Sequence, residues 1–185
     1  IEPEVFANIF SAANTDCVFQ FASNGMKDML RQFRPSSMED LILLVAAYRP
    51  GPMQYIPEII KVKQGQKTPA YIADGLEDIM SLTYGSPIYQ EQVMSIFNKI
   101  AGFSLGESDI IRRAMSKKKL AVLTDPKTDY HGKFVHGLIA NHAAKENAEA
   151  YWEQLLDFAS YAFNKSHAAA YAHVSYYTAW LKYHY

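Results

Sequence analysis

The densest positive charge in the sequence suggests a site for an anion. Arg112, Arg113 and the run Lys117–Lys119 place five cations within eight residues. On a helix, with about 100° per residue, Arg112 and Lys119 share one stripe, and Arg113 and Lys117 lie beside it. Like charges four residues apart cost roughly 0.2–0.5 kcal/mol. Clustering them without acidic partners makes sense if a polyanion supplies the counter-charge, with arginine forming bidentate contacts to phosphate. The alternative is a solvated basic face.

A second candidate anion site precedes the last helical pattern of the chain. We expect Ser166 to cap that helix, with Asn164, Lys165 and His167 at its positive N-terminal end. Backbone N–H groups at such an end favour an anion. The alternative is ordinary helix capping with a hydrogen-bonded histidine. Tyr171, one turn further on, is a candidate for stacking on a base.

Three further segments carry weaker signals. The stiff loop Arg49–Pro52 could hold the Arg49 guanidinium in place after a helix end. In Ile88–Met94 we expect the Gln and Glu side chains to face water. The aromatic residues between 171 and 185 are more typical of a packed core helix than of a stacking platform.

Several catalytic motifs are missing from the sequence. It has no Walker A loop, no Gly-x-Gly-x-x-Gly and no His-Glu-x-x-His. Its acidic pairs lie at or near expected helix starts, where the helix dipole explains them: Glu39 with Asp40, Glu77 with Asp78, and Glu107 with Asp109. Ser166 and His167 have no evident triad partner. We therefore predict a chain that holds phosphates but has no catalytic residue and no metal site of its own.

Helical periodicity runs through most of the chain, and strand alternation is weak everywhere. Apolar residues repeat at helical spacing in 41–48 and 93–100. Ser104 and Glu107 form a capping-box pattern that opens a helix through Met115, with its apolar side at Ile110, Ile111, Ala114 and Met115. Further helices are expected over 132–142, over 145–161 and from about 166 to the end. Loops are expected at 49–52, 64–69, 84–87 and 124–128. The pattern predicts an all-α fold in one compact domain covering 1–185.

Composition excludes several classes of protein. Of the 185 residues, 49% are hydrophobic and 20% are charged, which is enough to bury a core. No apolar run is long enough to span a membrane. A net charge of −1 excludes a globally basic nucleic-acid coat, and a single cysteine excludes an internal disulfide framework.

Five segments together resemble the fingers region of bacterial C-family replicative DNA polymerases, of the DNA polymerase III α (DnaE) type. They occur in the order found in that family and extend over nearly the whole chain. The segments are Val18–Met26, Tyr48–Met53, Ile88–Met94, Leu105–Lys119 and Phe163–Tyr171.

The resemblance implies a multi-helix fingers domain that closes over an incoming deoxynucleoside triphosphate. It implies that the triphosphate faces Arg112 and Arg113, with Lys117 nearby and Arg49 projecting toward the active site. Lys118 and Lys119 would add electrostatic attraction for triphosphate or DNA. The nascent base pair would lie near the segment Asn164, Lys165, Ser166 and His167, and near Tyr171.

The resemblance also implies what the chain lacks. In this family the metal-binding aspartates belong to the palm, so Mg²⁺ would be held outside this chain, and the isolated piece is expected to be inactive. Expected partners are deoxynucleoside triphosphate, primer–template DNA, the palm and thumb domains, the sliding clamp and other replicase subunits, in the bacterial cytoplasm and with no membrane. The alternative is a non-catalytic helical module that binds DNA or a protein through 108–119.

Overall fold

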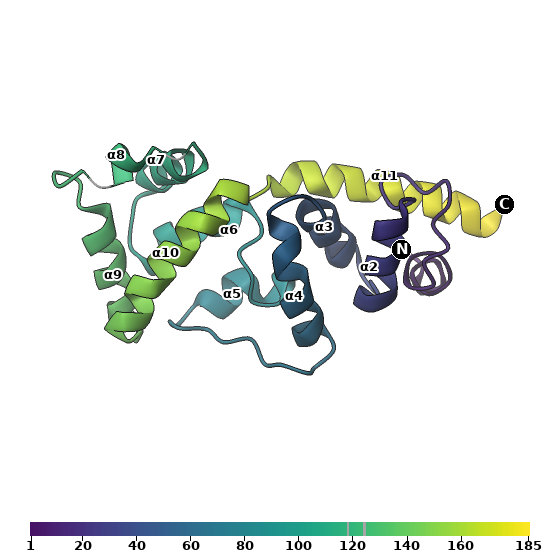
Figure 1. The fold of residues 1–185 in the computed structure, drawn as a ribbon, viewed down its shortest axis with the longest axis horizontal. Coiled ribbons are helices and arrows are strands. Elements are labelled where there is room, and N and C mark those ends of the chain that lie inside the picture. Colours follow the sequence, from purple (N-terminus) through teal and green to yellow (C-terminus); the bar gives the residue numbers. More distant parts are fainter. Residues whose placement is uncertain (118, 124) are drawn as a thin grey trace. The chain divides into compact units, whose positions relative to one another are not determined.

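The computed structural model describes residues 1–117, 119–123 and 125–185, without the side chains of residues 120 and 159. The described chain is all-α, as predicted: helices are joined by turns and loops, and the only β-type pairing among the described residues is one bridge between Tyr89 and Phe163. Contacts divide the chain into two compact units (Figure 1). Unit 1 comprises 1–66 and 164–185, and unit 2 comprises 67–163. That 1–185 acts as one fingers domain stays a prediction.

Unit 1 contains both ends of the chain. Its N-terminal part is a succession of short helices, and its last element is the long helix α11, drawn in yellow in Figure 1. The elements are α1 (Pro3–Val5), the π-helical turn η1 (Phe6–Ser11), α2 (Asn24–Phe33), α3 (Met38–Ala47), the 3₁₀ turn η2 (Pro52–Tyr55), α4 (Ile56–Lys63) and α11 (Lys165–His184).

Helix α11 packs against α3 through small side chains. Its buried face consists of Ala168, Ala172, Ser175, Tyr176 and Ala179, and the three alanines and the serine allow close approach of another backbone. The opposite face, with Val174, Tyr177 and Leu181, is exposed. The expectation of a deeply packed aromatic helix was therefore wrong for this stripe, because small residues and Tyr176 form the buried face instead.

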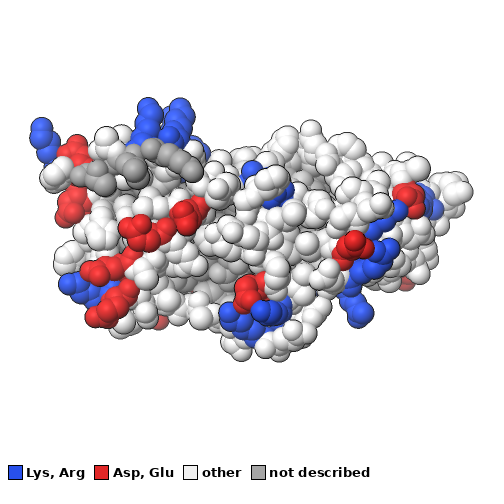
Figure 2. Space-filling model, in the orientation of Figure 1, with Lys and Arg blue, Asp and Glu red and all other residues white. Residues whose placement is uncertain are grey.

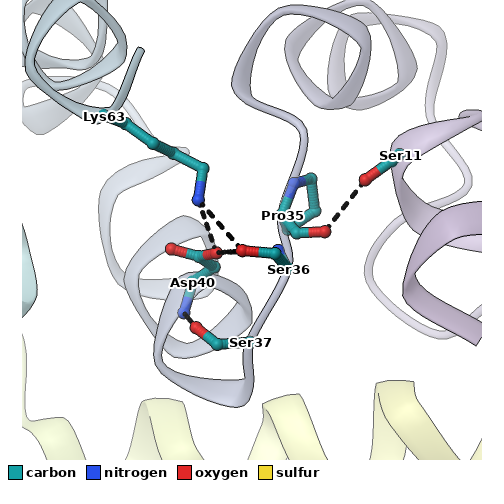
Figure 3. Close-up of polar contacts among 6 residues, drawn as sticks. All are labelled: Ser11, Pro35, Ser36, Ser37, Asp40 and Lys63. Atoms are coloured by element: carbon teal, nitrogen blue, oxygen red, sulfur yellow. Dashed lines mark hydrogen bonds and ion pairs between the residues drawn. The ribbon is translucent and has the colours of Figure 1, made fainter. Parts of the chain in front are cut away.

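A buried ion pair joins α3 and α4 inside unit 1 (Figure 3). The Lys63 Nζ lies 2.7 Å from the Asp40 carboxylate, and the side chains are only 12% and 2% exposed. The same carboxylate accepts a hydrogen bond from the Ser36 backbone N–H at 2.8 Å. Lys63 also lies over the Phe33 ring, 5.1 Å from its centroid. The sequence had suggested only a helix-dipole role for Asp40.

Unit 2 surrounds an aromatic and aliphatic core. Phe97, Phe134 and Trp152 are buried there and contact one another through their rings. The elements are α5 (Leu76–Met80), the 3₁₀ turn η3 (Ser81–Thr83), α6 (Gln90–Ser95), the π-helical turn η4 (Ile96–Ile100), α7 (Leu105–Ser116), α8 (Leu120–Leu123), α9 (Tyr130–Ala140) and α10 (Lys145–Tyr161).

Most predicted boundaries agree with the structure. Residues 145–161 form α10 as expected, and Ser104 and Glu107 form the predicted capping box. The last helix begins at Lys165, so its N-cap is Asn164 and the assignment of Ser166 was wrong by two residues. Thr124, in one predicted loop, lies outside the described residues. No helix in the described part of the chain is both long and apolar enough to cross a membrane.

Gly137 allows α9 to pass close to the backbone at the end of η4. A Cβ at Gly137 would lie 2.5 Å from the Ala101 Cα and 2.6 Å from its carbonyl oxygen. We expect Gly137→Ala to lower the free energy of unfolding by about 1–3 kcal/mol, since backbone atoms would have to shift. Gly106→Ala in α7 is the matched control, because nothing lies within 4 Å of its Cβ position. Gly106→Ala should raise the free energy of unfolding by roughly 0.5–1 kcal/mol. Urea unfolding measures both, and equal effects would contradict the close approach.

Candidate functional site: the basic end of α7 and the start of α11

Helix α7 is anchored at its N-terminus by the capping box. The Ser104 hydroxyl accepts from the Glu107 backbone N–H at 3.2 Å, and the Glu107 carboxylate accepts from the Ser104 N–H at 3.0 Å. The Ser104 hydroxyl also donates to the same carboxylate at 2.8 Å, and the two bonds that Ser104 donates to it lower the pKa of Glu107. The helix buries Ile111, Ala114 and Met115, but Ile110 is exposed, so its placement on the apolar side was wrong.

One carboxylate pairs with both arginines of α7. Asp109 Oδ1 lies 2.8 Å from an Arg112 Nη, and its Oδ2 lies 2.7 Å from an Arg113 Nη. The idea that the basic cluster has no acidic partner is therefore incorrect, because Asp109 is one helical turn before both residues. Two cations share one anion, so the pair of arginines keeps an excess of one positive charge.

The two arginines differ in exposure and in the contacts they make. The Arg112 side chain is 17% exposed and also donates to Gln90 Oε1 at 3.1 Å, whereas Arg113 is 66% exposed. Lys117 and Lys119 are exposed as well, and neither has an ion-pair partner among the described residues. Figure 2 shows Lys and Arg side chains gathered over α7. Lys118 lies outside the described residues.

The Asp109 carboxyl reports on the arginine pairing. The hydrogen bond from Arg112 and the charge of Arg113 hold the pKa of Asp109 below its ordinary 3.8. The ionised form is thus favoured in the folded chain, and its pairing is present above pH 3.8 and lost as pH falls through the lowered pKa. We expect Arg112→Gln to move the Asp109 pKa back toward 3.8. Carboxyl NMR titration checks this, and an unchanged pKa would show that the pairing is absent in solution.

The start of α11 is held by capping and by an ion pair within unit 1. The Asn164 side chain accepts from the His167 backbone N–H at 2.9 Å. Lys165 Nζ lies 2.9 Å from the Glu39 carboxylate at the start of α3. Ser166 and His167 are exposed. This end of the helix therefore presents polar groups beside a lysine whose charge is already paired.

Three rings follow one another beside this helix start. The His167 and Tyr171 ring centroids are 4.4 Å apart, and those of Tyr171 and Phe19 are 5.4 Å apart. His167 and Phe19 are exposed, and Tyr171 is half-buried. The sequence had not singled out Phe19 as a functional residue, because it is distant from Tyr171 along the chain.

Arg49 follows the opposite end of α3 from Glu39. The helix has ten residues, so Arg49 is roughly 15 Å along its axis from the Glu39–Lys165 pair. Its Nε donates to the Ala46 carbonyl at 2.8 Å, and burial lowers its pKa. The structure therefore does not place Arg49 beside the start of α11.

The polar residues of Ile88–Met94 do not all face water, contrary to expectation. Gln92 is buried, and its amide donates to the Thr83 hydroxyl at 2.7 Å and to the Ile79 carbonyl at 3.0 Å. Gln90 is half-buried against Arg112. Helical periodicity alone could not reveal these bonds, since their partners come from η3, α5 and α7.

The candidate residues of the two units differ in their chemistry. Unit 2 holds the exposed cations of α7, and unit 1 holds the capped helix start with its row of rings. Among the described side chains, no three His, Cys, Asp or Glu cluster as a metal site would require. The class that the described residues define is an all-α module with exposed cations at the C-terminal end of one helix.

Comparison with known proteins identifies the family. The sequence-family model described as the bacterial DNA polymerase III alpha subunit finger domain matches residues 2–142. The DNA polymerase III subunit alpha of Treponema pallidum is 48% identical over 98% of this chain, and that of Borreliella burgdorferi is 47% identical over 96%. The chain belongs to the DNA polymerase III α fingers family. It spans about 15% of the length of these relatives.

The DNA polymerase III subunit alpha of Neisseria meningitidis serogroup B is 44% identical over all of this chain. The aligned part is 16% of the length of that subunit. The resemblance predicted from the five segments is thereby confirmed.

Proposed function

We propose that this chain binds the triphosphate of the incoming deoxynucleotide, and the nascent base pair, in a replicative DNA polymerase. The observation that carries the proposal is the exposed, incompletely neutralised basic end of α7 within a polymerase fingers sequence. Phosphoryl transfer depends mainly on positioning and charge neutralisation. A module with exposed cations and no metal cluster among its described residues can supply both.

The arginines take different roles in this proposal. Arg113 is exposed and shares its carboxylate, so it can exchange Asp109 for a phosphate at little cost, because exposed ion pairs contribute only about 0–1 kcal/mol. Arg112 is held in place and offers its remaining N–H groups. Lys117 assists at the triphosphate, and Lys119 and Lys118 attract triphosphate or template backbone.

The start of α11 would serve the base rather than the phosphates. Asn164, Lys165, Ser166 and His167 would lie near the nascent base pair, and Tyr171, supported by Phe19, would offer a ring for stacking. Arg49 would act from the other end of α3. Closure of the fingers would exclude water and admit only a correctly shaped pair.

The wider setting is also a proposal. The described residues do not form a site that fits Mg²⁺, so we assign metal binding to the palm of the full-length subunit and no step to a metal in this chain. The 185 residues alone should then be inactive. Primer–template DNA, palm, thumb, sliding clamp and other replicase subunits would be its partners in the bacterial cytoplasm.

Arginine footprinting on the full-length subunit tests the proposal. With primer–template present, phenylglyoxal should modify Arg113, and the correct deoxynucleoside triphosphate should protect it while the deoxynucleoside without phosphates does not. Arg31, which is 57% exposed on α2, is the control and should remain reactive throughout. Protection by DNA alone would favour the alternative of a DNA-binding module, and no protection by nucleotide would refute the triphosphate role.

A further inference from the structure

Gln90, the first residue of α6, connects three parts of unit 2. Its side-chain oxygen accepts from Arg112 Nη1 at 3.1 Å. Its side-chain nitrogen donates to the Ala162 carbonyl at 3.1 Å, and its backbone N–H donates to the Phe163 carbonyl at 2.9 Å. One residue therefore bonds the guanidinium on α7 and the backbone that follows α10.

The Gln90 contact completes the orientation of the Arg112 guanidinium. Arg112 gives its Nε–H and one Nη2–H to Asp109 Oδ1, at 3.2 and 2.8 Å. With the Nη1–H bonded to Gln90, three of the five N–H donors of an arginine are used. The two N–H groups that remain, one on Nη1 and one on Nη2, are available to a phosphate.

Residues around Gln90 also hold the last residues before Asn164. The Phe163 N–H donates to the Ile88 carbonyl at 3.1 Å, and Tyr89 and Phe163 form the single parallel bridge. Residues 88–90 thus run beside 162–163. Asn164, the next residue along the chain, caps α11. The segment that orients Arg112 is the same one that anchors the backbone leading into α11.

From this geometry we propose that Gln90 is a positioning residue for the incoming nucleotide, acting through Arg112. It holds the guanidinium with two donors available for a phosphate, and it ties that guanidinium to the backbone preceding the base-pair segment. The inference rests on the proposed function, since it requires Arg112 to contact the triphosphate. Without the bond to Gln90, only Asp109 among the described residues would hold the Arg112 guanidinium. The guanidinium could then adopt orientations that miss the phosphate.

A double-mutant cycle in the full-length subunit tests the proposal. Gln90→Met keeps the length of the side chain and the backbone bond but removes both amide contacts. We expect it to raise the KM for deoxynucleotide about tenfold, the scale of one hydrogen bond to a charged group, with kcat changed less than about threefold. In an Arg112→Ala background the same substitution should change KM less than about twofold, because no guanidinium remains at position 112 for Gln90 to orient.

The control and the contradicting outcomes are distinct. Gln92→Met removes a buried amide whose partners are η3 and α5, so any effect it has on KM should be the same with or without Arg112. An unchanged KM for Gln90→Met, or a tenfold effect that persists without Arg112, would overturn the role of Gln90. If Arg112→Ala and Arg113→Ala both leave KM and kcat unchanged, the proposed function itself fails.

Discussion

Replacing Arg113 with alanine in the full-length subunit should lower kcat/KM for deoxynucleotide by about 30- to 1,000-fold. This corresponds to roughly 2–4 kcal/mol, the scale of removing one electrostatic donor from a preorganised site. The side chain is 66% exposed, so its loss should create no cavity. Its folded-state pairing with Asp109 is a surface interaction, so the stability of the subunit should hardly change. Pre-steady-state incorporation at a series of nucleotide concentrations gives the measurement.

Two comparisons make the Arg113 result specific. Arg113→Lys keeps the charge but loses the planar fork, so it should recover only part of the activity. Lys145→Ala removes an exposed cation at the start of α10 that pairs with Glu149, and its kcat/KM should equal that of the unmodified subunit. Unaltered nucleotide kinetics for Arg113→Ala, or an equal loss for Lys145→Ala, would show that α7 does not contact the triphosphate.

Replacing Lys63 with methionine should lower the free energy of unfolding of unit 1 by about 3–5 kcal/mol. The substitution removes the Lys63 ammonium from the Asp40 carboxylate, which is 2% exposed, and breaking a buried ion pair from one side is strongly destabilising. Lys61→Met on the same helix is the matched control. Lys61 pairs with Glu58, and both side chains are about half exposed, so its loss should cost roughly 0–1 kcal/mol. Chemical denaturation monitored by circular dichroism measures both.

A double variant separates the ion pair from the packing. Asp40→Leu combined with Lys63→Met removes both charges, so it should regain much of the stability lost in Lys63→Met, because neither charge is then buried. The Ser36 N–H would lose its acceptor, so the recovery should be incomplete. Equal losses for Lys61→Met and Lys63→Met would contradict the burial of the Asp40 pair.

Local sequence signals predicted the elements well where the interactions are local. The Ser104–Glu107 capping box and the bounds of α10 follow from spacing within one helix, and both agree with the structure. The cap of α11 was displaced to Ser166 because Asn and Ser are equally good caps, and only the bond from the His167 N–H distinguishes them.

Interactions between distant segments could not be predicted in this way. Asp40 and Lys63 are 23 residues apart, and Arg112 and Gln90 are 22 apart, so no helical period connects them. The role of Asp109 was different, since its spacing to Arg112 and Arg113 was visible in the sequence. It was missed because the carboxylate was attributed to the helix dipole alone, whereas the one-turn pairing also operates at that position.

Amide hydrogen exchange on the full-length subunit tests the central claim most directly. The subunit would be bound to a primer ending in a dideoxynucleotide, so that the correct nucleotide binds without reacting. We predict that the correct deoxynucleoside triphosphate slows exchange at the C-terminal turn of α7 and at the start of α11, and that a mismatched one does so much less. Tight binding of the correct nucleotide with unchanged exchange in both segments would contradict the account.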